Sequence, residues 1–177
     1  MPDTIRTLAE LNQQFADNTA GVIAPQDIRD LFASLMVHGE IGSGAKSAVT
    51  LATGYQPLDF NVPGVVGRGL NVDIANKWIN GVPVSMKAEV TLEVLFQGAN
   101  NTTFDFAVFR NPAGAAEQLQ RLSGSIRIFN ASMVGHLVMS SSIQLEPGDT
   151  LRAGVRGGAV SFTLLRGALR VRRIAIE

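Results

Sequence analysis

The strongest constraint on the fold is a strict alternation of apolar and polar residues between Val84 and Phe96. In the stretch VSMKAEVTLEVLFQ, every second residue from Val84 is apolar, and polar residues fill the positions between them from Ser85 to Glu93. Successive side chains of a β-strand point to opposite faces, whereas those of a helix return to one face about every 3.6 residues. The pattern therefore predicts a long strand with one buried face.

Further stretches of this kind lie on both sides of the long strand. After the turn sequence GANN, the stretch TFDFAVF places Phe104, Phe106 and Val108 on one side, which predicts a β-hairpin. The sequence LEPGD, with Pro147 and Gly148 at its centre, predicts a type II turn between two strands. Other strands are predicted at SAVTLA, LNVDIA, SIRIFNA, GHLVMSS, TLRAGV, VSFTLL and LRVRRIAI. Short strands at this spacing are typical of a β-sandwich or a barrel.

Charge is unevenly distributed along the chain. Residues 1–40 carry six acids and two bases, whereas residues 121–177 carry eight arginines and three acids. The two ends can attract each other within one chain or between copies, or the charges are simply solvated. The alternation of the last predicted strand is broken at Arg172 and Arg173, which indicates either a β-bulge or an arginine at a surface between subunits.

The amino-terminal part follows a helical rather than a strand period. A first helix is predicted at about Thr4–Phe15, capped by Asp3 or Thr4, and the turn sequence DNTAG follows it. A second helix is predicted to start at Pro25. The apolar stripes of the two helices contain Leu8, Leu11, Phe15, Ile28, Leu31, Phe32 and Leu35.

These helices are too short to be stable by burying their stripes against each other alone. They need the β-domain, a neighbouring copy or another protein. Because glycines and small polar residues follow, we predict a linker at residues 39–46. The predicted organisation is a helical segment at residues 1–38, this linker, and a β-domain at residues 47–177.

The composition argues against several kinds of site. The chain has no cysteine, which excludes disulfides, thiolate metal ligands and a cysteine nucleophile. Its two histidines, His38 and His136, are too few for a typical metal-dependent jelly roll, and no catalytic or cofactor-binding motif occurs. We therefore expect no metal, no cofactor and no enzymatic activity.

Nucleic-acid and membrane partners are not expected either. The arginines lack interleaved aromatic residues, and no nucleic-acid-binding motif surrounds them. No run of about 18 apolar residues occurs, and no apolar leader is visible at the amino end. The stretch LEVLFQG resembles the recognition sequence of a picornaviral protease. It completes the long alternating strand, so we interpret it as a coincidence or a remnant of cloning.

Two parts of the sequence resemble known structural proteins. The stretch LAELNQQFADNTAGVIAPQDIRDLFASL is similar to an amino-terminal segment of structural proteins of tailed bacteriophages. The stretch IQLEPGDTL resembles a strand of the tumour necrosis factor-like jelly roll that such proteins often carry. Together these resemblances imply a mainly β protein, in which two short amino-terminal helices precede a jelly-roll β-sandwich. The jelly-roll family is usually trimeric, which implies a homotrimer.

The resemblance implies a non-enzymatic virion protein. It would decorate or cement the capsid, or form a head fibre. Its helical attachment segment, residues 1–38, would bind the major capsid protein or another virion protein through the seven stripe residues named above, which are the candidate attachment residues. It would be made in the cytoplasm of the bacterial host and then lie on the capsid surface. The alternative is a receptor-binding module of a tail fibre or baseplate, with host-surface sugar bound by loops such as Gly64–Gly69 or Asn76–Gly81.

Overall fold

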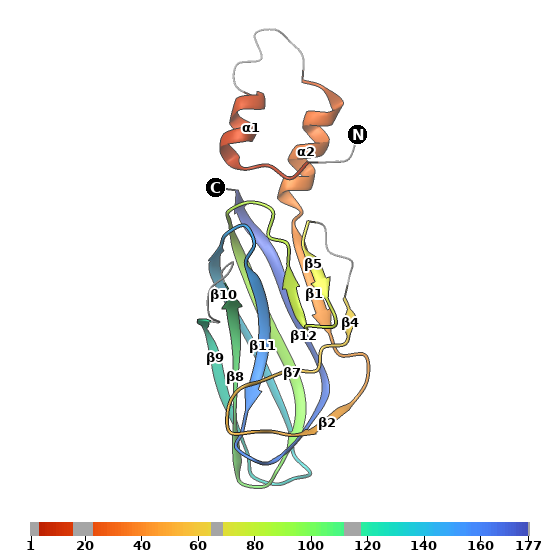
Figure 1. The fold of residues 1–177 in the computed structure, drawn as a ribbon, viewed down its shortest axis with the longest axis vertical. Helices are drawn as coiled ribbons and strands as arrows, with labels where there is room; N and C mark the ends of the chain where they lie inside the picture. Colours follow the sequence, from red (N-terminus) through yellow and green to blue (C-terminus); the bar gives the residue numbers. More distant parts are fainter. Residues whose placement is uncertain (1–3, 16–22, 65–68, 112–117, 177) are drawn as a thin grey trace.

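The molecule is a sandwich of two antiparallel β-sheets with a pair of short helices at one end (Figure 1). The computed structural model describes residues 4–15, 23–64, 69–111 and 118–176. The helices are α1 (Leu8–Phe15) and α2 (Pro25–Leu35). The predicted mainly β fold with two amino-terminal helices is confirmed. The predicted turn DNTAG lies outside the described residues.

Within the described residues, each sheet has six strands. The first sheet contains β1 (His38–Gly42), β2 (Ser47–Thr50), β4 (Val62–Pro63), β7 (Met86–Gly98), β10 (Val134–Leu145) and β12 (Ser161–Ile176). The second contains β3 (Gln56–Pro57), β5 (Asn71–Asp73), β6 (Trp78–Asn80), β8 (Thr102–Asn111), β9 (Gln118–Ile128) and β11 (Thr150–Arg156). The main strand orders are β10-β7-β12-β1-β4 and β5-β6-β11-β8-β9.

The long alternating stretch forms the centre of the core. Every second residue of β7 from Met86 to Phe96 is fully buried, as the alternation predicted. The ring of Phe96 meets the rings of Phe104 and Phe106, at centroid distances of 5.3 and 4.9 Å. Because these two partners belong to β8, this aromatic cluster joins the two sheets.

The predicted hairpin between β7 and β8 is wrong. Strand β7 pairs with β10 and β12, whereas β8 pairs with β9 and β11. Residues 99–101 therefore cross from the first sheet to the second. Both edges of β7 are already occupied by other strands, and its apolar row faces the row of β8 across the sandwich instead of lying beside it.

The predicted linker at residues 39–46 is wrong over its first half. Residues 38–42 form β1, which pairs along its whole length with β12 and also with β4. A side chain at Gly39 would lie 3.0 Å from the Cβ of Leu70, and one at Gly42 would lie 3.0 Å from the carbonyl oxygen of Gly167. These glycines are therefore explained by close packing in a sheet and not by a flexible connection.

Two predicted irregularities of the strands are present. The register between β12 and β7 shifts between Arg173 and Ala175, which supports the bulge among the two alternatives given for Arg172 and Arg173. In the turn before β11, Gly148 has φ of +86°, and the Asp149 amide donates to the Glu146 carbonyl oxygen at 3.0 Å. A positive φ at the third turn residue is the signature of the predicted type II turn.

Candidate functional site

Helix α1 is shorter than its predicted extent. It begins at Leu8, and residues 4–7 precede it without helical structure. The Glu10 carboxylate accepts a hydrogen bond from the Thr7 amide at 2.8 Å, and the Glu10 amide donates to the Thr7 hydroxyl at 3.2 Å. This reciprocal pair is a capping box, and its T-x-x-E signature, TLAE, is visible in the sequence. The predicted cap at Asp3 or Thr4 is therefore wrong.

Helix α2 begins as its sequence predicts. Pro25 occupies the first helical turn, and the Asp27 carboxylate accepts a hydrogen bond from the Ala24 amide at 2.9 Å. Asp27 also accepts from the Gln14 side chain at 2.8 Å, which ties α2 to α1. The helix ends with the Met36 amide donating to the Phe32 carbonyl oxygen at 3.1 Å.

The polarity of α2 is inverted relative to an ordinary surface helix. Its buried residues are Asp30, Ala33 and Ser34. Its large apolar side chains lie on the opposite side, where Ile28, Phe32 and Leu35 are 40%, 56% and 50% exposed. A surface helix normally turns its apolar stripe to the core and its polar side chains to water. We call the exposed row Ile28, Phe32, Leu35 and Met36 the α2 stripe.

Asp30 organises the buried side of α2. This residue has no exposed surface, and its carboxylate accepts hydrogen bonds from the Thr4 amide at 2.8 Å and the Gln26 side chain at 2.6 Å. Its second oxygen lies 2.9 Å from Nε and 2.8 Å from Nη2 of Arg6, so one carboxylate oxygen receives both donors of the ion pair. The hydrogen bond from the Thr4 amide, followed by those from Gln26 and Arg6, holds the pKa of Asp30 below its ordinary value.

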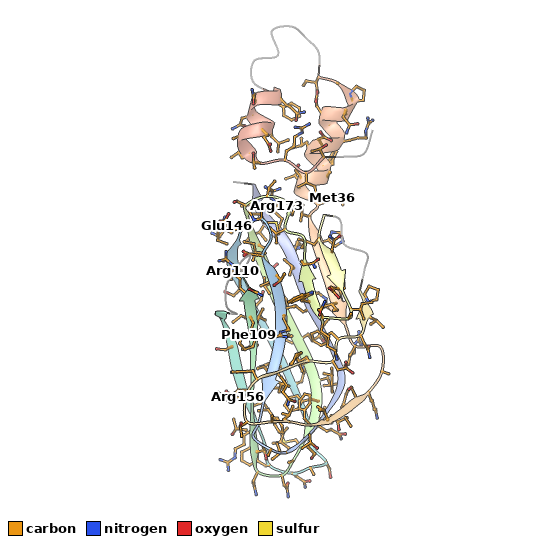
Figure 2. The ribbon with its side chains drawn as sticks, in the orientation of Figure 1. Met36, Phe109, Arg110, Glu146, Arg156 and Arg173 are labelled. Atoms are coloured by element: carbon orange, nitrogen blue, oxygen red, sulfur yellow. The ribbon has the colours of Figure 1, made fainter. Side chains whose placement is uncertain are left out.

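A second set of contacts joins the helices to the β-sandwich. Arg173 is buried, and its Nη1 donates to the carbonyl oxygens of Ser34 and Arg6 at 3.0 and 3.3 Å. Ile5 packs against the core beside Gly69, where an added Cβ would lie 2.2 Å from the Ile5 Cδ1 atom. Figure 2 shows Arg173 and Met36 at the junction between the helices and the sheets. The inner face of the helical segment therefore makes its contacts with residues of this same chain.

The structure distributes the seven predicted attachment residues unequally. Ile28, Phe32 and Leu35 form most of the α2 stripe, and Leu8 of α1 is also exposed. Phe15 and Leu31 are half-buried, whereas Leu11 is buried and unavailable for contact with another protein. The prediction missed Met36, which is exposed directly after α2 and extends the stripe.

The α2 stripe continues into a groove at the base of the helix. A cavity of about 230 Å³ is lined by Leu35, Met36, Val37, His38, Arg172 and Arg173. Ile174 of β12 is exposed and lines a neighbouring small cavity with Leu35 and Arg173, at the same end of the sandwich. The exposed apolar surface therefore extends from α2 to the start of the outer face of the first sheet.

The outer face of the first sheet combines ion pairs with exposed valines. Arg172 lies 2.8 Å from Glu89, and Arg170 bridges Glu93 at 3.0 Å and Glu40 at 3.2 Å. The hydrogen bond from Arg170 lowers the pKa of Glu93. On this face the edge strand β10 exposes Val134 and Val138. Arg172 is outside and Arg173 inside, so the two arginines that broke the predicted alternation have different environments.

The other places where a ligand could bind show few functional side chains. A cavity of about 280 Å³ lies beside β2 and β3, and at its rim the Lys77 ammonium pairs with the Asp59 carboxylate, which lowers the pKa of Asp59. Among the described residues, no group of three metal-ligating side chains comes together, and no helix has the length and apolarity needed to cross a membrane. Of the two proposed sugar-binding loops, residues 65–68 lie outside the described part, and residues 78–80 form β6.

Comparison with known proteins supports the jelly-roll fold. No family model and no curated protein sequence matches this chain. Among solved structures, the chain is similar to the Eiger TNF from S. frugiperda, with a TM-score of 0.63 and 12% sequence identity. The match covers 80% of this chain and 94% of the Eiger TNF chain. The predicted tumour necrosis factor-like jelly roll is therefore confirmed as the fold.

Proposed function

We propose that this chain is a non-enzymatic structural protein of a tailed-bacteriophage virion, which attaches to the capsid through its helical segment and forms a homotrimer. The observation that carries the proposal is the inverted polarity of α2. The bacteriophage resemblance of residues 8–35 gives the setting, and the α2 stripe gives the attachment surface. The partner is the major capsid protein or another virion protein, and the role is decoration or cementing of the capsid.

The α2 stripe supports an attachment role because its side chains are not needed for the packing of α2 against the rest of the chain. The buried side of α2 already has its contacts through Asp30, Ser34 and Arg173. Four large apolar side chains nevertheless remain exposed in one row. A contiguous exposed apolar patch on a soluble protein marks an interaction surface, since its contact with water is unfavourable. Covering the stripe with a virion partner would remove this cost.

Replacing Phe32 with aspartate tests the attachment role. We expect particle binding to weaken by at least about 100-fold, because an unpaired charge buried in an apolar interface costs several kcal/mol. The free energy of unfolding should change by less than about 0.5 kcal/mol, since the Phe32 side chain is mostly exposed. The measurement is co-sedimentation with particles that lack this protein, beside chemical denaturation.

The matched control is Asn12→Asp, which adds the same charge at an exposed polar position of α1. This control should bind particles as the unmodified protein does. If Phe32→Asp binds normally, the α2 stripe is not the attachment surface. If Phe32→Asp also unfolds the protein, the helices are part of the structural core, and the proposal of a separate attachment segment is wrong.

The homotrimer rests on the outer face of the first sheet together with the family resemblance. This face presents Val134 and Val138 beside charged pairs that sister copies would cover. Light scattering at micromolar concentration should give about three times 18.8 kDa. We expect Val138→Glu to dissociate the trimer while the sandwich stays folded, because Val138 is exposed in the single chain. A clean monomer of the unmodified protein would refute the trimer.

A further inference from the structure

We propose that the outer face of the second sheet holds a binding site for an acidic saccharide, meaning a sugar ring that carries a carboxylate. The site is centred on Arg156 of β11, with Asp105 and Phe109 of β8 and with Tyr55 from the segment before β3. It lies on the sheet opposite to the proposed trimer face and away from the helices. This inference does not depend on the proposed function.

Arg156 is fixed in place although it is accessible. Its Nε donates to Asp105 at 3.0 Å, and its guanidinium carbon lies 4.8 Å from the centre of the Tyr55 ring. Ser125 donates to the other oxygen of Asp105 at 2.5 Å, which holds that carboxylate. The Arg156 side chain is still 49% exposed, and within the described part of the chain its Nη atoms have no hydrogen-bond partner.

These contacts prepare Arg156 for a planar anion. A guanidinium offers paired N–H groups that match the two oxygens of a carboxylate. Binding such a ligand normally requires an arginine side chain to lose its rotational freedom. Here the ion pair with Asp105 and the stacking on Tyr55 have already restricted that freedom, so less of the binding energy is lost on ordering.

An aromatic surface adjoins the guanidinium. The rings of Tyr55 and Phe109 meet edge to face, with centroids 5.1 Å apart, and both residues are partly exposed. Phe109 can lie flat on the sheet because Gly154 has no side chain; an added Cβ there would be 2.9 Å from the Phe109 ring. Figure 2 shows Phe109 and Arg156 on neighbouring strands of this sheet. The rings offer an apolar surface for the C–H groups of a sugar, next to a donor for its carboxylate.

The charge of this face favours an anion. On the second sheet, Arg127 lies on the same outer face as Arg156, and Asp105 is the one acid among the described outward side chains of β8, β9 and β11. A nucleic acid is less suited, because its recognition uses rings that stack successive bases, whereas these two rings meet edge to face.

The test is a titration of the isolated protein with N-acetylneuraminic acid, followed by ligand-observed NMR, beside its methyl ester and a single-stranded oligonucleotide. We expect saturable binding of the acid and at least tenfold weaker binding of the ester. Arg156→Gln and Arg156→Lys should each weaken binding of the acid at least tenfold, because lysine keeps the charge but loses the paired donors. Lys46→Gln, which removes an exposed charge elsewhere, should bind normally.

Three results would overturn the proposal: equal binding of the acid and the ester, normal binding by Arg156→Gln, or binding of the oligonucleotide without binding of the acid. Tyr55→Leu serves as a second variant, since it removes the ring under the guanidinium and keeps every charge. It should also weaken binding of the acid. Thermal unfolding of each variant separates loss of the site from loss of the fold.

Discussion

Replacing Phe96 with alanine is expected to lower the free energy of unfolding by about 3–5 kcal/mol, the largest effect of any single substitution considered for this chain. Phe96 is fully buried, and its ring lies within 5.4 Å, centre to centre, of those of Phe104, Phe106 and Phe162. Removing the ring leaves a cavity at the point where the two sheets meet. Chemical denaturation followed by circular dichroism measures the loss.

The control for this substitution is Phe129→Ala. Phe129 follows β9 and is 62% exposed, so its removal should change the free energy of unfolding by less than about 0.5 kcal/mol. Both variants lose the same atoms, so the difference between them reports burial alone. If Phe96→Ala costs less than about 1 kcal/mol, the aromatic cluster does not hold the sheets together.

The second large effect is expected for Asp30→Asn, and it should be confined to the helical segment. Asparagine keeps the size of the side chain but loses the ion pair with Arg6, and its NH₂ group cannot accept the hydrogen bonds that one carboxylate oxygen now receives. We expect hydrogen exchange of the α2 amides to accelerate at least about tenfold, because the segment opens locally more often. The amides of β7 should keep their protection.

The same carboxylate gives the helical segment a pH dependence. The folded-state pKa of Asp30 is lowered, so folding favours its charged form. Its contribution is therefore fully present above the ordinary aspartate pKa of about 3.9 and is lost as the pH falls through the lower folded-state pKa. NMR spectra of the α2 amides should show the segment loosening in that acidic range.

Asp73→Asn is the matched control for Asp30→Asn and for the acid titration. The pKa of Asp73 is also lowered, chiefly by the side-chain hydrogen bond from Asn76, but this turn belongs to the second sheet. Its substitution should leave hydrogen exchange and acid loosening of α2 unchanged. If acid loosens α2 to the same degree in Asp30→Asn as in the unmodified protein, another group controls the segment.

The sequence predicts the strands well where one face is buried and the other is wet. The row Met86–Phe96 follows that rule along its whole length, and the type II turn at Gly148 follows from local backbone chemistry. The same alternation does not predict which strands pair with one another. Strand β8 has the correct alternation for a hairpin with β7, but its neighbours are chosen by contacts with segments far away in the sequence.

The helical segment shows why the candidate site was only partly predictable. The spacing of Ile28, Leu31, Phe32 and Leu35 identifies a stripe, but it does not reveal whether that stripe faces inward or outward. Helical periodicity predicts that the charged side chain of Asp30 is exposed to solvent. In the structure it is buried and bonded to residues 4–6. These partners lie 26 and 24 residues away along the chain, where the helical period gives no information. The T-x-x-E signal at Thr7 was, by contrast, available from local sequence.

The position of β12 has a consequence for how the protein is made. It follows every other described strand along the chain, yet it lies inside the first sheet and pairs with β1, β2 and β7. During synthesis, β1 and β7 therefore each have an unpaired edge, with free backbone N–H and C=O groups, until β12 has left the ribosome. Such edges readily pair with other chains. Translation that stops before residue 161 should thus yield aggregates rather than a smaller folded domain, and folding of the whole sandwich should be slow.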